Sequence, residues 1–206
     1  MFRIRGGFRA LGAVVGGFLA LVALIASCGP AFAHTGSLLV GGFTSGFTHP
    51  IRGPDHLLAM FAVGLWGAQM GGRAIWSLPV VFPLIMSVGG FLGVVGVPLS
   101  NTEIMVALSV LVLGAAIALE WRAPPSLAII IVGAFAIFHG FAHGRELPDA
   151  ADPLAYGIGF VSATGFIHIA GISFGLLSGP LLAGWGARLA GGLVSLAGLY
   201  FLALAI

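Results

Sequence analysis

The chain has 206 residues, of which 59% are hydrophobic and only 7% are charged, and its formal net charge is +2. Soluble domains carry about 25% charged residues, so this chain cannot cover itself with a solvated surface and is expected to be an integral membrane protein. The absence of lysine excludes P-loop and Schiff-base sites, the single cysteine (Cys28) excludes a disulfide framework or a thiolate-rich metal site, and no basic patch suggests nucleic acid.

Residues 1–33 have the three-part pattern of a secretory signal. An arginine-containing start is followed by an apolar run at 10–26 and by Ala31-Phe32-Ala33, which matches the A-x-A cleavage pattern. We expect cleavage after Ala33, which would make His34 the mature N-terminus. Two alternatives stay open: acylation of Cys28 at a lipobox-like sequence, and an uncleaved signal that forms an additional helix.

Six later stretches predict membrane-spanning helices, because a span needs about 20 mainly apolar residues. They are residues 54–72, 74–97, 103–121, 125–145, 153–180 and 187–206. The shorter, glycine-rich segment 35–48 predicts a re-entrant or interfacial piece. A break is expected at His49-Pro50, because the residue before proline disfavours helix. The prediction is an all-α, polytopic bundle that forms a single transmembrane domain over 34–206, with seven hydrophobic helices if the signal is retained.

The arginines predict the orientation of this bundle. With the mature N-terminus outside, Arg73, Arg122 and Arg188 fall at the inner ends of spans, and Arg145 is the exception near an outer end. Basic residues are enriched on the cytoplasmic side of membrane proteins. We therefore expect both mature termini to lie outside.

Small and aromatic residues predict how the helices pack. Glycines four residues apart, such as Gly89/Gly93 and Gly140/Gly144, favour close contact between helix backbones. The tryptophans lie near predicted span ends, where aromatic belts form. They are Trp66, Trp76, Trp121 and Trp185.

The first candidate site is the motif His49-Pro50-Ile51-Arg52-Gly53-Pro54-Asp55-His56, at the start of the first span. A bend within it would bring His49 towards Asp55 and His56. Two imidazoles and a carboxylate suit a borderline divalent metal, and ionisable residues at membrane depth are usually functional. The alternative is that Asp55 complements a helix N-terminus and the histidines lie at the membrane interface.

The second candidate site is Phe138-His139-Gly140-Phe141-Ala142-His143-Gly144-Arg145-Glu146, at the end of the span 125–145. Spacings of four and seven residues place His139, His143 and Glu146 on one helical face. This arrangement predicts three metal ligands along about two turns. The alternative is a structural histidine pair, with Glu146 paired to Arg145 at the headgroups.

Two further histidines are weaker candidates for metal binding. His168 is expected near mid-membrane in the span 153–180, where a structural role is the alternative to a role as a metal ligand. His34 would offer an amine and an imidazole after cleavage, although an ordinary chain terminus is the simpler interpretation.

The two motifs resemble signatures of the HupE/UreJ family of bacterial membrane proteins. Residues 49–56 match H-P-x-x-G-x-D-H, residues 138–146 match F-H-G-x-A-H-G-x-E, and the signal, span count and length also fit. The resemblance implies a nickel or cobalt permease of the inner membrane, often associated with hydrogenase or urease systems. It implies that six residues handle the metal: His49, Asp55, His56, His139, His143 and Glu146.

The residues and the resemblance together predict a secondary permease for a divalent transition metal, with Ni²⁺ favoured and Co²⁺ possible. We expect no catalytic residue and no permanently bound cofactor, and the metal ion and the lipid bilayer as partners. The alternatives are an intramembrane zinc hydrolase, a haem-binding membrane protein and a metal sensor. The hydrolase is disfavoured because H-x-x-x-H here lacks the glutamate of H-E-x-x-H.

Overall fold

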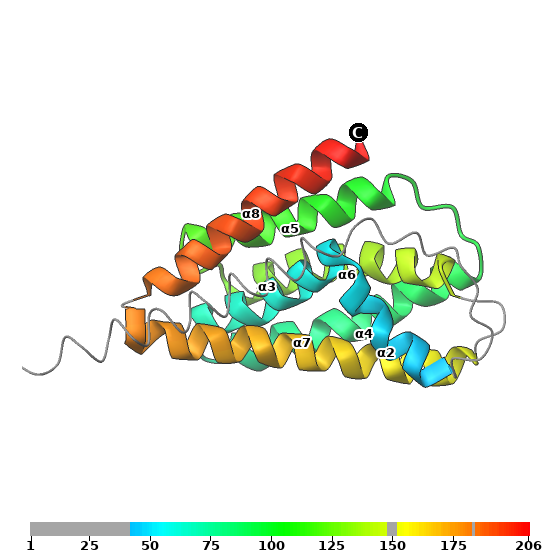
Figure 1. Cartoon of the computed structure of the whole chain (residues 1–206), viewed down its shortest axis with the longest axis horizontal. Coiled ribbons are helices and arrows are strands. Elements are labelled where there is room, and N and C mark those ends of the chain that lie inside the picture. Colours follow the sequence, from blue (N-terminus) through cyan, green and yellow to red (C-terminus); the bar gives the residue numbers. More distant parts are fainter. Residues whose placement is uncertain (1–41, 148–151, 183) are drawn as a thin grey trace, which may run out of the picture.

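The computed structural model describes residues 42–147, 152–182 and 184–206, which fold into a bundle of helices (Figure 1). The helices are α2 (Gly42–Arg52), α3 (Pro54–Met70), α4 (Ala74–Val94), α5 (Thr102–Ala118), α6 (Pro125–Arg145), α7 (Pro153–Leu182) and α8 (Trp185–Ala205). The all-α prediction is confirmed. The predicted signal at 1–33 and His34 lie outside the described residues.

The predicted spans correspond to α3 through α8, with ends that differ by a few residues. Within the described part of the chain, α4, α6, α7 and α8 are long and apolar enough to cross a membrane, whereas α5 is apolar but shorter. The 17 residues of α3 extend over about 26 Å at 1.5 Å per residue. These apolar helices fit a membrane protein.

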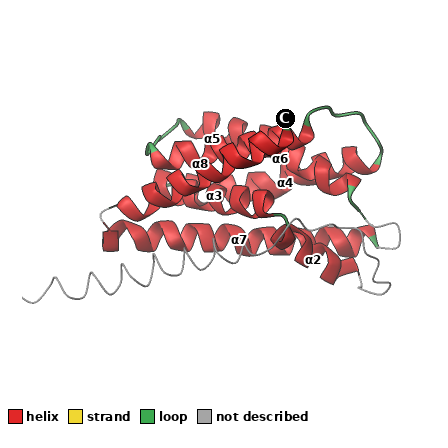
Figure 2. Ribbon diagram, turned by 45° about the horizontal axis from the view of Figure 1, so that its top comes forward, coloured by secondary structure: helices red, strands yellow, loops and turns green. Residues whose placement is uncertain are grey.

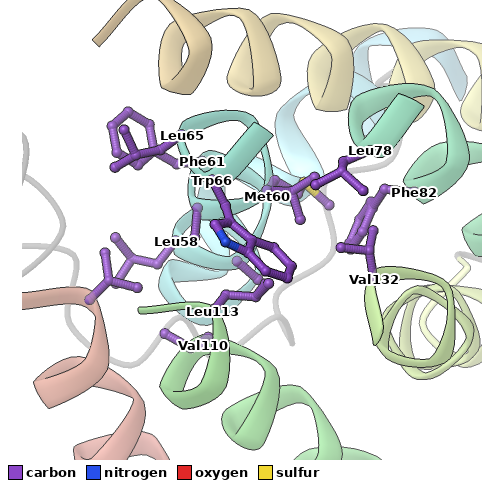
Figure 3. Packing of buried hydrophobic residues seen from close by; sticks show 14 of the residues in the cluster. Leu58, Met60, Phe61, Leu65, Trp66, Leu78, Phe82, Val110, Leu113 and Val132 are labelled. Atoms are coloured by element: carbon purple, nitrogen blue, oxygen red, sulfur yellow. The ribbon is translucent and has the colours of Figure 1, made fainter. Parts of the chain in front are cut away.

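Helix α3 occupies the centre of the bundle, and α7 runs along its side (Figure 2). Its residues 58–67 are all buried, and Trp66 and Met60 are surrounded by side chains of α4, α5 and α6 (Figure 3). A helix that is apolar on every side is enclosed by protein. The first turn of α3, which carries Asp55 and His56, is therefore held by the helices around it.

Helices α2 and α3 form one discontinuous helix alongside α7 (Figure 1). A Cβ atom at Gly46 of α2 or at Gly64 of α3 would overlap the backbone of α7, so both pieces pack closely on that helix. The helix breaks at Gly53, whose backbone is extended (φ −92°, ψ 104°), and Pro54 begins α3. Proline is favoured at this first position, because the N–H group that it lacks would have no helical partner there.

The predicted break at His49-Pro50 is wrong. Helix α2 continues through both residues to Arg52, and Pro50 is buried inside it. Proline removes one helical hydrogen bond, and the packing of α2 on α7 keeps the segment helical. Residues 42–48 of the expected re-entrant or interfacial segment form the first part of α2, and its earlier residues are not described.

Glycines join α4 to α6 as predicted. A Cβ atom at Gly89 would overlap the carbonyl of Ile137, and one at Gly140 would overlap the carbonyl of Met86. Both neighbours are backbone atoms, which cannot move aside as a side chain can. The two helices therefore approach as closely as glycine allows.

The prediction of an interfacial belt is wrong for Trp66, which is fully buried. Its Nε1–H donates to the Trp121 carbonyl at 2.9 Å. Gln69 and Arg188 donate to carbonyls in the last turn of α5 at 2.9 Å and 3.2 Å. The last carbonyls of a helix have no partner within it, so Gln69 and Arg188 close the C-terminal end of α5, and Trp66 holds the segment that follows it.

Candidate metal centre

Four histidines from three helices lie against one another where α3 begins. The ring centroids are 4.8 Å apart for His49 and His143, 4.2 Å for His143 and His56, and 4.7 Å for His56 and His139. We call these four residues the imidazole cluster. Helices α2 and α3 supply one residue each and α6 supplies two, so the two sequence motifs form one site.

The imidazole cluster leads from the surface into the bundle. At its open end the Glu146 side chain is 54% exposed and the His49 side chain is 24% exposed. His143 and His56 are buried, and His139 is fully enclosed. A small ligand entering at Glu146 would meet successive imidazoles as it loses contact with water.

The open end of the cluster offers a set of nitrogen and oxygen ligands. His49 Nε2 lies 2.9 Å from Glu146 Oε2, and His143 Nδ1 lies 3.8 Å from the same oxygen. Potential ligand atoms of these three residues all fall within 4.8 Å of one another. The hydrogen bond from His49 holds the pKa of the Glu146 carboxyl below its ordinary value, against the opposite effect of partial burial. Glu146 is therefore an anion at neutral pH.

Asp55 fixes the proton of His56. Its Oδ1 accepts hydrogen bonds from the His56 backbone N–H at 2.8 Å and from His56 Nδ1 at 2.9 Å. The Nδ1 atom thus carries the proton, and the lone pair is on Nε2, which is buried without a partner among the described residues. A carboxylate behind an imidazole in this way orients metal-binding histidines and raises their basicity.

Ser109 of α5 determines which nitrogen of the His139 ring carries the proton, as Asp55 does for His56. The Ser109 hydroxyl donates to the Val106 carbonyl at 2.6 Å, and its oxygen lies 2.7 Å from His139 Nε2. Because the single hydroxyl proton is already used, Ser109 accepts the proton of Nε2. The lone pair of His139 is therefore on Nδ1, which has no partner in the described part of the chain.

The cluster presents several nitrogens that lack hydrogen bonds. Neither ring nitrogen of His143 is hydrogen-bonded within the described residues, and His56 Nε2 and His139 Nδ1 are also unpaired. Each unpaired buried polar group costs about 1–3 kcal/mol. A bound cation would satisfy these lone pairs, which supports a metal site more than a structural histidine pair.

The three predicted ligands of the second motif do not lie together as one set. His143 and Glu146 face His49 of α2, whereas His139 lies one turn deeper and faces His56 and Ser109. The alternative pairing of Glu146 with Arg145 is not present within the described ranges, where Glu146 pairs with histidines.

His168 of α7 lies apart from the imidazole cluster. The fully buried Phe82 of α4 stands between them, with its ring centroid 5.5 Å from that of His139 and 5.4 Å from that of His168. One aromatic ring therefore separates the innermost imidazole of the cluster from the next histidine.

Several residues at the site are not apparent from the sequence. Phe82 contacts His139, Phe160 lies 4.3 Å from His143 between ring centroids, and Glu103 is close enough to Asp55 to act on it electrostatically. Ser109 could have been identified from the sequence, because it is an isolated polar residue in the apolar run of α5. The two phenylalanines resemble every other aromatic residue in the chain.

Comparisons with known proteins place the chain in a family by its sequence. The family model described as "HupE / UreJ protein" matches residues 21–201. A curated relative, Protein HupE of Rhizobium leguminosarum bv. viciae, is 43% identical over 168 residues, which cover 82% of this chain and 87% of the relative. No solved structure gives a significant match.

Proposed function

The chain belongs to the HupE/UreJ family, which is associated with nickel and cobalt transport, and we propose that it is a secondary permease that takes up Ni²⁺. The imidazole cluster is the observation that carries this proposal. Imidazole and carboxylate are suitable ligands for Ni²⁺ and Co²⁺, and the cluster leads inward from an exposed carboxylate. The resident membrane would be the bacterial inner membrane, with both mature termini on the periplasmic side.

Entry begins at the open end of the cluster. Glu146, His49 and His143 replace part of the water shell of the ion, since their ligand atoms converge within 4.8 Å. The ion then reaches the lone pairs of His56 and His139. Asp55 and Glu146 offset its two positive charges, which reduces the cost of bringing a divalent ion out of water.

The membrane potential supplies a driving force for uptake. Two charges that cross an inside-negative potential of 100 mV gain about 4.6 kcal/mol. The discontinuous helix α2–α3 at the site supports the proposal as well, because secondary transporters commonly bind their substrates at interrupted helices. The family link to hydrogenase and urease nickel metabolism suggests that the ion supplies the maturation of such enzymes.

Uptake of radioactive nickel at nanomolar concentration tests this function. The host is a bacterium that lacks its own nickel importer and expresses either the wild-type chain or the His139→Ala/His143→Ala variant at equal abundance. We expect saturable uptake that the double substitution abolishes, because it removes half of the imidazoles. No uptake by correctly inserted wild-type protein would refute nickel transport, and equal uptake by both chains would refute the role of these histidines.

Ser109→Ala is expected to weaken nickel binding about 10-fold, the lower end of the usual effect of removing a hydrogen-bond partner behind a ligand. The substitution removes the hydrogen-bond acceptor of His139 Nε2, so the ring can adopt either tautomer. Equilibrium dialysis of purified protein measures the affinity. Ser109→Thr, which keeps the hydroxyl, should restore most of it, whereas unchanged binding in Ser109→Ala would contradict the tautomer assignment.

A further inference from the structure

A second group of buried polar atoms lies beyond Phe82. His168 is 1% exposed, and neither of its ring nitrogens has a hydrogen-bond partner within 3.5 Å in the described ranges. The hydroxyl of Thr164, also buried, is likewise unpartnered there. The two residues are four positions apart in α7, so they occupy the same face of that helix.

Helix α4 contributes a backbone oxygen to this group. Pro83 has no N–H, so the Pro79 carbonyl lacks the donor that a helix normally provides four residues later. This carbonyl is close enough to the His168 ring to act on it electrostatically, without the geometry of a hydrogen bond. Within a membrane an unpaired backbone group is costly and is tolerated where it meets protein or a polar cavity. Pro79, Thr164 and His168 thus bring oxygen and nitrogen donors together from two helices.

We propose that His168, with the Thr164 hydroxyl and the Pro79 carbonyl, forms a second, inner site for the transported divalent cation, separated from the imidazole cluster by Phe82. This proposal rests on the proposed function. An imidazole and two neutral oxygens are ligands that a borderline cation such as Ni²⁺ accepts. The cation reaches them after the imidazole cluster, because Phe82 contacts both His139 and His168.

The two sites differ in charge, and this gives them different roles. The imidazole cluster has Asp55 and Glu146, whereas no described acidic side chain forms an ion pair with His168. A site of neutral donors holds a divalent ion more weakly. Conduction needs sites that bind well enough to admit an ion and weakly enough to release it, so the inner site is the point of release.

The test compares wild-type protein with His168→Leu and Thr164→Val, and with Ile169→Ala as a control at a residue that is 55% exposed on the outside of α7. Binding of radioactive nickel is measured by equilibrium dialysis of purified protein in nanodiscs, and uptake is measured in proteoliposomes.

We expect one tight and one weak ion in the wild type and in Ile169→Ala. His168→Leu should retain the tight ion, lose the weak one and reduce the maximal uptake rate about 10-fold or more at unchanged KM. Thr164→Val, which keeps the shape of the side chain, should weaken only the second ion.

The possible outcomes separate the inner site from the proposed function. A folded His168→Leu protein that still binds the weak ion, or that transports at the wild-type rate, overturns the inner site. Transport by a wild-type protein that binds a single ion also overturns it and leaves the permease intact. Loss of the weak ion in His168→Leu, with no transport by any chain, supports the inner site and refutes the permease.

Discussion

Asp55→Asn is expected to lower nickel uptake about 100-fold, the upper end of the usual effect of changing a group behind a metal ligand. Asparagine keeps the size of the side chain and an oxygen that can accept the His56 hydrogen bonds, so the substitution removes only the charge. Without that charge, His56 is a weaker base and the divalent ion loses one of its two counter-charges. Both losses weaken binding of the ion at the imidazole cluster, so this effect should be among the largest.

Asp152→Asn is the matched control for this experiment. Asp152 is an exposed aspartate at the same end of the bundle, and its Oδ1 accepts hydrogen bonds from the backbone of Leu154 and Ala155 at 2.9 Å and 3.1 Å. Asparagine is an equally good N-cap, so uptake should stay at the wild-type level. Normal uptake by Asp55→Asn, or equal losses in both variants, would show that the Asp55 charge does not support transport.

Gly140→Ala is expected to destabilise the protein by about 3 kcal/mol, at the upper end of the usual cost of overpacking. The added Cβ would overlap the backbone carbonyl of Met86, so α4 and α6 must move apart. Because Gly140 lies between His139 and His143, this movement also displaces two imidazoles of the cluster. Urea unfolding in mild detergent measures the loss, and nickel uptake should fall with it.

Gly133→Ala provides the control on the same helix. The nearest atoms to a Cβ at this position are Ile85 Cγ1 at 3.8 Å and Val81 Cγ1 at 4.0 Å, which are ordinary contacts. Alanine also favours helix over glycine, so the stability should be unchanged or slightly higher. If the two variants were equally stable, the close approach of α4 and α6 would not limit the packing of the bundle.

The helices were predictable because their signals are local. Apolar runs set their positions, and Pro125 and Pro153 begin α6 and α7 where the sequence suggested. Local rules failed where tertiary packing opposes them. Pro50 stays inside α2 because α7 supports that helix, and Trp66 is buried because the carbonyl of Trp121, in the segment after α5, accepts its N–H.

The ligand residues were predictable, and their arrangement was not. Histidines in an apolar chain stand out, and both motifs contribute to the site. Which imidazole faces which depends on how α2, α3 and α6 are packed, and no spacing along one helix encodes that. The helical spacing correctly placed His139 and His143 on one face, yet their partners come from different helices.

The central position of α3 has a consequence for how the chain assembles during synthesis. Chains emerge from the ribosome N-terminal end first, so α3 enters the membrane before α5, α6 and α7 do. Asp55 and His56 then meet lipid and water in place of protein neighbours. His49 and Glu146, 97 residues apart in the chain, pair only after α6 has been inserted. A nascent chain therefore acquires its metal ligands late, and a chain truncated before α6 has no cluster to bind the ion.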